Sequence, residues 1–202
     1  MTCQATEEIL KKFDREISEK KLAIIGAYGV IGEAVSKILV PKFKHTTLIG
    51  RREEKLKELS SKIKGSCNIS TTIITDDADV IITATNHPKA LIESKHLRKN
   101  AVVIDVSQPP NVSKQLCNQR KDIVRIDGGY VDFPIKYHIP IPSVPEGKLF
   151  ACIVETIMQA MENEHENHVG SIDLDHLEKT KKWARKYGFM LKQFTNFGEP
   201  VK

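Results

Sequence analysis

Long apolar runs are missing from this chain of 202 residues. No apolar stretch approaches the ~20 residues that a helix needs to cross a membrane, so we expect no membrane span. The first residues, Met1 to Glu8, lack the basic and apolar regions of a signal peptide. The four cysteines are widely scattered and form no C-x-x-C pair. This pattern favours reduced thiols in the cytoplasm over a disulfide framework.

A strong excess of charge is also missing. The formal net charge is +5, which is too small and too dispersed along the chain to indicate nucleic-acid binding. It suits a phosphorylated ligand or an acidic partner protein. Apolar residues make up 40% of the chain and charged residues 28%, as in globular proteins. The length allows one α/β domain with an appendage.

What the chain does contain is a glycine turn. An apolar run over 22–25 ends at Gly26, and Gly29 and Gly32 follow. Apolar residues then recur at helical spacing over 30–39. This pattern of strand, tight turn and helix predicts the first unit of a dinucleotide-binding fold.

The glycines have a physical reason at such a turn. A Cβ there would keep a pyrophosphate away from the backbone, and the start of the helix supplies free N–H groups and a positive dipole end. The alternative is a glycine turn that binds nothing. We expect the turn to hold a cofactor through six residues, which are Gly26, Ala27, Tyr28, Gly29, Val30 and Ile31.

Further apolar runs predict five more strands, at 45–49, 69–74, 79–85, 101–107 and 122–127. With the helices between them, they predict a Rossmann-type α/β fold, a doubly wound parallel sheet that binds its ligand at the carboxyl ends of the strands. We expect a second group of cofactor-binding residues at that edge, namely Ala84, Thr85, Asn86, Val106, Ser107 and Gly128.

Arg51 and Arg52 follow the second predicted strand. An NAD enzyme places Asp or Glu near this point to bind the ribose 2′-hydroxyl, whereas arginine offers planar donors to a 2′-phosphate. The two arginines therefore predict NADP(H) as the cofactor. The alternative is a solvated basic start of the following helix, which continues with Glu53 and Glu54.

The remaining segments predict three helices and a loop. We expect a short helix over 6–17 with Thr6 as a candidate cap, and four prolines within 130–148 predict a connecting loop. Helices are predicted at 149–164 and at 174–187, the second one capped by Asp173 and ended by Gly188. The tail over 195–200 is expected to be extended or coil.

These elements predict three parts of the chain: an N-terminal helix over 1–20, an NADP-binding domain over 21–145, and a helical extension over 146–202 that packs on that domain.

Cys152 is the candidate nucleophile. A helical projection groups most apolar residues of its segment on one stripe, made of Phe150, Ile153, Val154, Ile157, Met158 and Met161. Cys152 falls roughly opposite, beside Glu155 and Gln159. It also lies in the first turn, where the dipole and free N–H groups favour a thiolate. The alternative is a core cysteine in a helix that is buried all round.

The histidines predict no metal site, because His165, His168 and His176 have no matching constellation of cysteines or carboxylates. A short-chain dehydrogenase is disfavoured, since no tyrosine after the glycine turn is followed four residues later by lysine. Amino-acid and shikimate-type dehydrogenases share the sheet but take acid/base residues from another domain.

Several motifs together carry a resemblance to a known family. They include Ile24-Ile-Gly-Ala-Tyr-Gly-Val-Ile-Gly32, Ala78-Asp-Val-Ile-Ile82, Val103-Ile-Asp105 with Pro110-Asn111, Asp127-Gly-Gly129, Leu149-Phe-Ala-Cys-Ile-Val-Glu-Thr-Ile157 and Lys186-Tyr-Gly-Phe189. The chain resembles the cofactor-binding half of aldehyde-forming long-chain acyl-[acyl-carrier-protein] reductases, without their N-terminal domain. The most specific match is the Phe-Ala-Cys-x-x-Glu signature.

The resemblance implies that Cys152 accepts an acyl group as a thioester and that NADPH then reduces it to an aldehyde. It implies acyl-carrier protein or acyl-CoA as the substrate partner. Because the N-terminal domain of that family contributes to the acyl-binding site, either this chain is a fragment, or a separate chain supplies that domain, or the substrate is different and smaller. Homo-oligomerisation stays open. Two other functions also remain: a dehydrogenase of the amino-acid or shikimate type that works with a partner domain, and a non-catalytic NADP-binding subunit.

Overall fold

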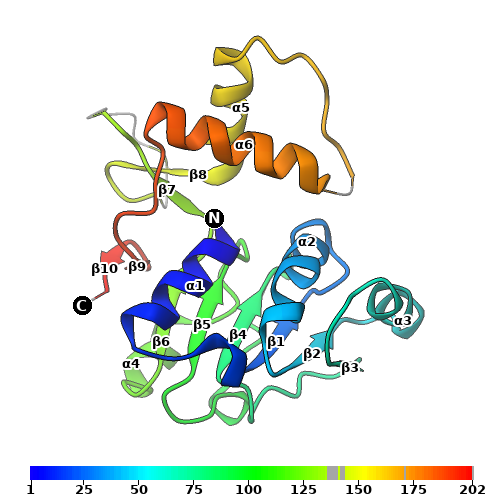
Figure 1. Cartoon of the computed structure of the whole chain (residues 1–202). Coiled ribbons are helices and arrows are strands. Elements are labelled where there is room, and N and C mark those ends of the chain that lie inside the picture. The colour runs from blue at the N-terminus through cyan, green and yellow to red at the C-terminus, as the bar shows by residue number, and fades with distance from the viewer. Residues whose placement is uncertain (136–140, 142–143, 171, 202) are drawn as a thin grey trace.

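A computed structural model of the chain describes residues 1–135, 141, 144–170 and 172–201. The main strands in these ranges are β1 (Lys21–Ile25), β2 (His45–Ile49), β3 (Cys67–Ser70), β4 (Val80–Thr83), β5 (Val102–Asp105) and β6 (Val124–Asp127). They form one parallel sheet in the order β3-β2-β1-β4-β5-β6. The direction of winding reverses between β1 and β4, which confirms the predicted Rossmann-type doubly wound α/β fold (Figure 1).

Helices cover one face of this sheet and mostly loops cover the other. The first face carries α1 (Thr2–Lys12), η1 (Ile17–Glu19), α2 (Val30–Leu39), η2 (Val40–Lys42) and α3 (Glu53–Ser61), which share one apolar core with β1 and β2. The second face carries η3 (Ser94–His96) and α4 (Lys114–Gln119). Because both faces are covered, β4 and β5 are buried along their whole length.

Two predicted elements of this part need correction. The third strand was expected over 69–74, but β3 begins at Cys67, where it finds its partner Thr46 in β2, and ends opposite the last residue of β2. The first helix was expected over 6–17, but α1 spans Thr2–Lys12. Thr6 lies inside α1 and does not cap it, because its hydroxyl donates to the carbonyl of Thr2 one turn earlier.

Most of the remaining chain lies beyond the carboxyl ends of the sheet strands, whereas its last segment returns to the side of β6 (Figure 1). The remaining chain consists of β7 (Tyr130–Asp132), β8 (Lys148–Phe150), α5 (Ala151–Met161), α6 (Leu174–Tyr187), β9 (Thr195–Asn196) and β10 (Glu199–Pro200). Its apolar core joins β7, β8, α5 and α6, and Trp183 is buried in it. The bounds, cap and stop of α6 agree with the prediction.

The expectation of a loop over all of 130–148 was wrong. β7 pairs with β8 in an antiparallel ladder, which the chain allows because its prolines begin only at Pro134. The helix expected over 149–164 therefore starts later, at Ala151, and ends at Met161. The extension is not purely helical, since β8, β9 and β10 belong to it. Pro140 and Pro142 lie outside the described residues.

The predicted apolar stripe of α5 is only partly buried. Val154 and Met158 are in the core, whereas Ile153 is 38% exposed and Met161 52% exposed. The buried side is rotated from the predicted centre because α6, β7 and β8 contact only one side of the helix.

Within the described ranges, no helix is long and apolar enough to cross a membrane. The division of the chain at residues 20 and 145 stays a prediction.

Candidate functional site at the carboxyl edge of the sheet

Backbone hydrogen bonds join the ends of neighbouring strands into one continuous edge. The amides of Gly26 and Ala27 donate to Ile49 at the end of β2, at 2.9 and 3.1 Å. On the other side, the amide of Ala84 donates to Ile25 at 2.8 Å. The amides of Val106 and Gly128 continue this pattern across β4, β5 and β6. The segments that the sequence marked as cofactor-binding therefore meet at one edge.

The glycine turn after β1 is packed too tightly for side chains. Gly26 has φ = +84°, and a Cβ on it would lie 2.3 Å from the carbonyl oxygen of Ala84. A Cβ on Gly32 would lie 2.0 Å from the carbonyl oxygen of Gly26. This close contact sets α2 directly on the turn, so that its first N–H groups, which lack partners within a helix, are presented at the edge. The turn thus fits a pyrophosphate.

The predicted cofactor-binding residues differ in how far they are exposed to solvent. Five of them are exposed, which are Val30, Ile31, Arg51, Arg52 and Asn86. Six are half-buried, which are Gly26, Tyr28, Gly29, Ala84, Thr85 and Val106. Ala27, Ser107 and Gly128 are buried, so their contribution is to shape the edge through packing and backbone contacts.

Tyr28 links the turn to the two arginines. Its hydroxyl oxygen accepts hydrogen bonds from the backbone N–H groups of Arg51 and Arg52, at 3.1 and 3.2 Å. The guanidinium carbon of Arg52 lies 5.8 Å from the centre of the Tyr28 ring. Burial by itself raises the pKa of Tyr28, but hydrogen bonds from Arg52 and Arg51 outweigh it, so the pKa is lowered overall.

The ends of β4 and β5 hold a buried polar network that the sequence interpretation missed. The Asp105 carboxylate accepts the Thr83 hydroxyl at 2.6 Å, and it also accepts the backbone amides of Ser107, Asn111 and Val112. The Asn111 side-chain oxygen then accepts the hydroxyls of Thr85 and Ser107. The network fixes the two loops that border the site. A carboxylate at the end of a wholly apolar strand was the sequence signal for it.

Cys152 is the second residue of α5, in the first turn as predicted. It is exposed. The preceding residue, Ala151, donates its amide to the carbonyl of Gly129, at 2.9 Å, just after the end of β6. The start of α5 is thereby tied to the same edge of the sheet that carries the glycine turn, and it points toward that edge in Figure 1.

Glu155 lies one helical turn after Cys152 and is held by α6. Its carboxylate oxygen is 3.0 Å from Nε2 of His176, which is buried. The His168 ring stacks on His176 with 3.4 Å between ring centres, and Trp183 meets His176 edge-on. No group of three or more metal-ligating side chains occurs among the described residues. His176 thus pairs with Glu155, and His168 packs on His176.

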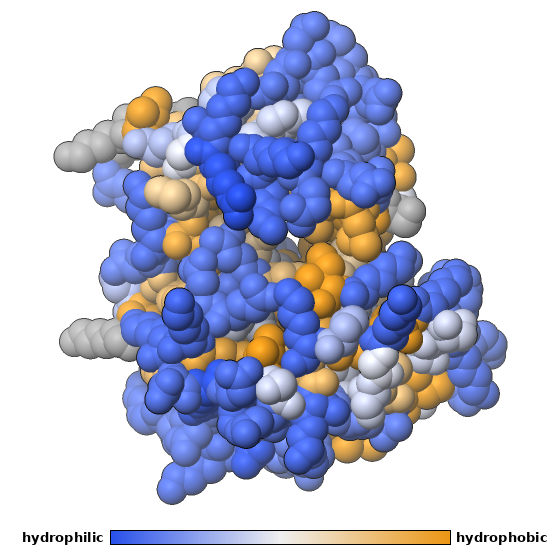
Figure 2. Space-filling model, viewed as in Figure 1, coloured by the Kyte–Doolittle hydropathy of each residue, from blue (hydrophilic) through white to orange (hydrophobic). Residues whose placement is uncertain are grey.

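Figure 2 shows a hollow between the sheet part and the α5–α6 part, with apolar side chains on both sides of it. The exposed apolar residues of α2 and α5 include Val30, Ile31 and Ile153, at 53, 43 and 38% exposure.

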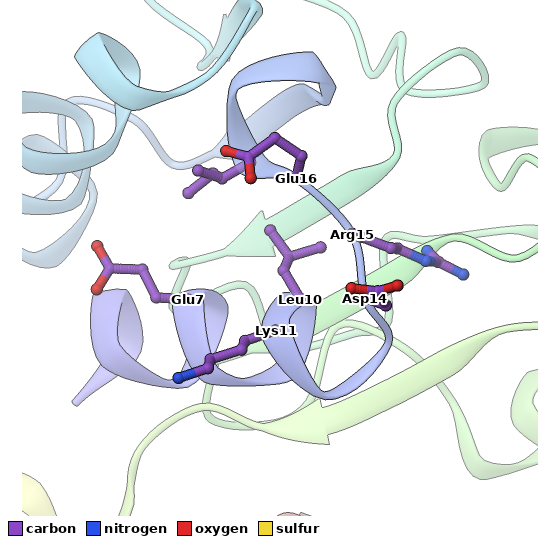
Figure 3. Close-up of a pocket in the computed structure, with 7 residues that line it drawn as sticks. Glu7, Leu10, Lys11, Asp14, Arg15 and Glu16 are labelled. Atoms are coloured by element: carbon purple, nitrogen blue, oxygen red, sulfur yellow. The ribbon is translucent and has the colours of Figure 1, made fainter.

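A separate pocket of about 280 Å³ lies between the end of α1 and η1. Figure 3 shows its lining side chains, which include Glu7, Lys11, Arg15 and Glu16. These residues lead into the start of β1, so this pocket lies at the amino end of the strand and not at the candidate site.

Two named proteins are similar to this chain in sequence. The chain is 27% identical over 209 residues to the aminotransferase PigE of Serratia sp., an alignment that covers 98% of this chain and 24% of PigE. It is 26% identical over 198 residues to the long-chain acyl-[acyl-carrier-protein] reductase of Synechococcus elongatus, covering 93% of this chain and 58% of the reductase. The chain thus spans only part of the length of these relatives.

Among solved structures, a dipicolinate synthase chain from Bacillus halodurans superimposes with a TM-score of 0.51 at 16% identity, over 61% of this chain and 43% of that one. At this identity the match supports the fold alone.

Residues 7–127 match the shikimate / quinate 5-dehydrogenase family. That range contains the glycine turn, Tyr28, the two arginines and the polar network of Asp105. The chain therefore forms an NAD(P)-binding oxidoreductase domain and belongs to the shikimate / quinate 5-dehydrogenase family.

Proposed function

We propose that this protein reduces an acyl thioester to an aldehyde with NADPH, through an acyl group carried on Cys152. The observation that carries the proposal is the position of the thiol. Cys152 is exposed in the first turn of α5, and the adjacent Ala151 is hydrogen-bonded to the end of the strand edge that holds the cofactor turn. Alignment over 93% of the chain with an acyl-carrier-protein reductase supports the same chemistry.

The first step is transfer of the acyl group. The thiolate sulfur of Cys152 forms a bond to the carbonyl carbon of the thioester, and the bond from that carbon to the carrier sulfur breaks. The carrier leaves as a thiol after taking up a proton. The first turn of α5 places backbone N–H groups that lack helical partners close to Cys152.

The second step is reduction of the acyl group on Cys152. NADPH supplies a hydride when it is bound. The carbonyl carbon accepts the hydride, its bond to the Cys152 sulfur breaks, and the aldehyde leaves while the thiolate is restored. The chain's own task is to orient the cofactor at the glycine turn and to exclude water from the thioester. The exposed apolar side chains of Val30, Ile31 and Ile153 suit contact with an acyl chain.

Several finer parts belong to the same proposal. Arg51 and Arg52 favour NADPH over NADH because guanidinium groups bind a 2′-phosphate through paired donors. The acyl donor is acyl-carrier protein or acyl-CoA, and a further domain or a separate chain supplies the part of the acyl site that these residues do not form. We place the reaction in the cytoplasm, on the grounds of the cysteine pattern.

The test is the intact mass of the protein after incubation with a long-chain acyl-CoA. We expect a mass increase equal to one acyl group, and no increase in the Cys152→Ala variant. Cys67→Ala is a matched control, because it removes a half-buried thiol on the edge strand β3 and should keep the adduct. An adduct that persists in Cys152→Ala would contradict the proposal.

A second candidate function is a dehydrogenase of the amino-acid or shikimate type that takes its acid/base groups from a partner domain. The match to residues 7–127 favours it, because this range ends before Cys152. Such an enzyme would keep NADPH-dependent turnover in Cys152→Ala. A non-catalytic subunit would bind NADPH tightly without turnover.

A further inference from the structure

The side chain of Tyr28 fills the adenosine end of the cofactor site. It begins in the glycine turn and reaches the end of β2, where its hydroxyl oxygen accepts the backbone N–H groups of Arg51 and Arg52. Its ring lies over Gly50, where a Cβ would be only 2.4 Å from the ring atom Cε1. A side chain at position 50 and a tyrosine ring at position 28 therefore exclude one another.

The two backbone N–H groups lie where the 2′ position of the adenosine ribose approaches this fold, at the end of the second strand. Backbone N–H groups are good donors to phosphate oxygens. In this structure both N–H groups already donate to the Tyr28 hydroxyl oxygen. The Arg51 and Arg52 side chains, by contrast, are exposed.

We propose that Tyr28 is a specificity-determining residue of the cofactor site, and that its hydroxyl stands where an oxygen of the NADP(H) 2′-phosphate would bind. NADP(H) has to displace this hydroxyl to reach the two amides, whereas NAD(H) leaves it in place. The preference of Arg51 and Arg52 for a 2′-phosphate is thus opposed by Tyr28. This inference rests on the proposed binding of NADP(H) at this edge.

The surroundings of the ring support such an exchange. The guanidinium carbon of Arg52 and the ammonium nitrogen of Lys55 lie 5.8 and 6.0 Å from the ring centre. Both cations contact the ring face weakly, and both remain beside a phosphate once the ring turns away.

The experiment measures equilibrium binding and needs no turnover. The probes are adenosine 2′,5′-bisphosphate and adenosine 5′-monophosphate, which differ only in the 2′-phosphate, and then NADP⁺ and NAD⁺. In Tyr28→Phe we expect the affinity for each 2′-phosphorylated probe, relative to its partner, to rise about tenfold, which is the gain of one charge-assisted hydrogen bond. Tyr187→Phe is the matched control, because it removes a hydroxyl bonded to Glu162 beyond the end of α5 and should leave the ratio unchanged.

Tyr28→Leu also lacks the hydroxyl and gives a second reading if Tyr28→Phe fails to fold. An unchanged or lowered ratio in the folded variant would overturn the proposal, since a lowered ratio would mean that the hydroxyl itself helps to bind the phosphate. Lack of binding by all four probes would overturn it as well.

The titrations of Tyr28→Phe, read together with the acyl-adduct test on Cys152, separate this inference from the proposed reaction. A raised ratio in Tyr28→Phe together with no acyl adduct on Cys152 would support the role of Tyr28 and reject the reductase. An acyl adduct on Cys152 together with an unchanged affinity ratio in Tyr28→Phe would support the reductase and reject the role of Tyr28.

Discussion

Cys152 differs from the other three cysteines in its surroundings. It is exposed, whereas Cys3, Cys67 and Cys117 are each partly covered. Burial raises the pKa of Cys3 to about 11, and it also raises the pKa values of Cys67 and Cys117. Because the thiolate is the reactive form, these three thiols are kept in the unreactive form at neutral pH.

We therefore expect iodoacetamide to alkylate Cys152 first at pH 8. A pKa of about 11 leaves roughly one Cys3 in a thousand as thiolate at that pH. Since the pKa of Cys3 is raised, its alkylation should accelerate as the pH rises toward 11. Peptide mass spectrometry at several times and pH values measures the order. Labelling of Cys3, Cys67 or Cys117 ahead of Cys152 at pH 8 would contradict this expectation.

At the scale of the elements, one carboxylate accepts three hydrogen bonds from the hairpin of β9 and β10. Asp127, at the end of β6, accepts the Thr195 hydroxyl and the amides of Phe197 and Gly198. It also pairs with the buried Arg125 at 2.6 Å. The Arg125 guanidinium lies 4.0 Å from the centre of the Phe197 ring. The C-terminal hairpin is therefore fastened to the same strand that leads into Gly128 and Gly129.

Replacing Asp127 by Asn should release this hairpin. We expect the free energy of unfolding to fall by about 2 kcal/mol, because the variant weakens charge-assisted hydrogen bonds while Arg125 keeps its second partner, Asp105, at 3.2 Å. Asn196→Ala is the control, since it removes a neutral acceptor of Arg125 and should cost about 1 kcal/mol. Urea unfolding measures both values, and hydrogen exchange at Phe197 and Gly198 reports release of the hairpin. Equal losses in the two variants would argue against the role of Asp127.

At the scale of the whole molecule, the cofactor edge and the thiol come from parts of the chain that are far apart in sequence. The sheet supplies the glycine turn and the arginines, whereas Cys152 belongs to α5, which lies beyond the carboxyl ends of the strands in Figure 1. A ligand bound between them stabilises the folded chain by mass action, because the unfolded chain does not bind it.

Arg51 and Arg52 should bind NADPH more tightly than NADH. NADPH should therefore raise the melting temperature more than NADH at the same concentration. At one hundred times its dissociation constant, NADPH should add about 2.7 kcal/mol, which corresponds to roughly 5–10 °C for a chain of this size. The Arg51→Ala/Arg52→Ala double variant should lose the difference between the two cofactors. Lys57→Ala/Lys62→Ala removes the same charge from ion pairs on the outer side of α3 and its end, and it should keep the difference. Equal shifts by NADPH and NADH in the unaltered chain would refute the assignment of the arginines.

The spacing of apolar residues correctly predicted the element whose bounds are set by residues within its own segment. The helix α6 was placed correctly to the residue, because its apolar spacing, the Asp173 cap and the Gly188 stop all lie within its own segment. The predicted bounds of β3 and α5 differ from the observed ones, because strand-pairing partners far along the chain set the ends of these elements. The Thr83–Asp105–Asn111 network was missed for the same reason, as its members come from three separated segments.

The sequence by itself determined the doubly wound sheet, the glycine turn, and the placing of Cys152 in the first turn of α5. Each follows from the order and spacing of residues that are close together along the chain. Only the tertiary structure decided that the Tyr28 hydroxyl takes the amides of Arg51 and Arg52, and that the start of α5 is tied to the end of β6. Contacts of this kind depend on how the close packing at Gly26 and Gly32 brings separate segments together, which no local pattern records.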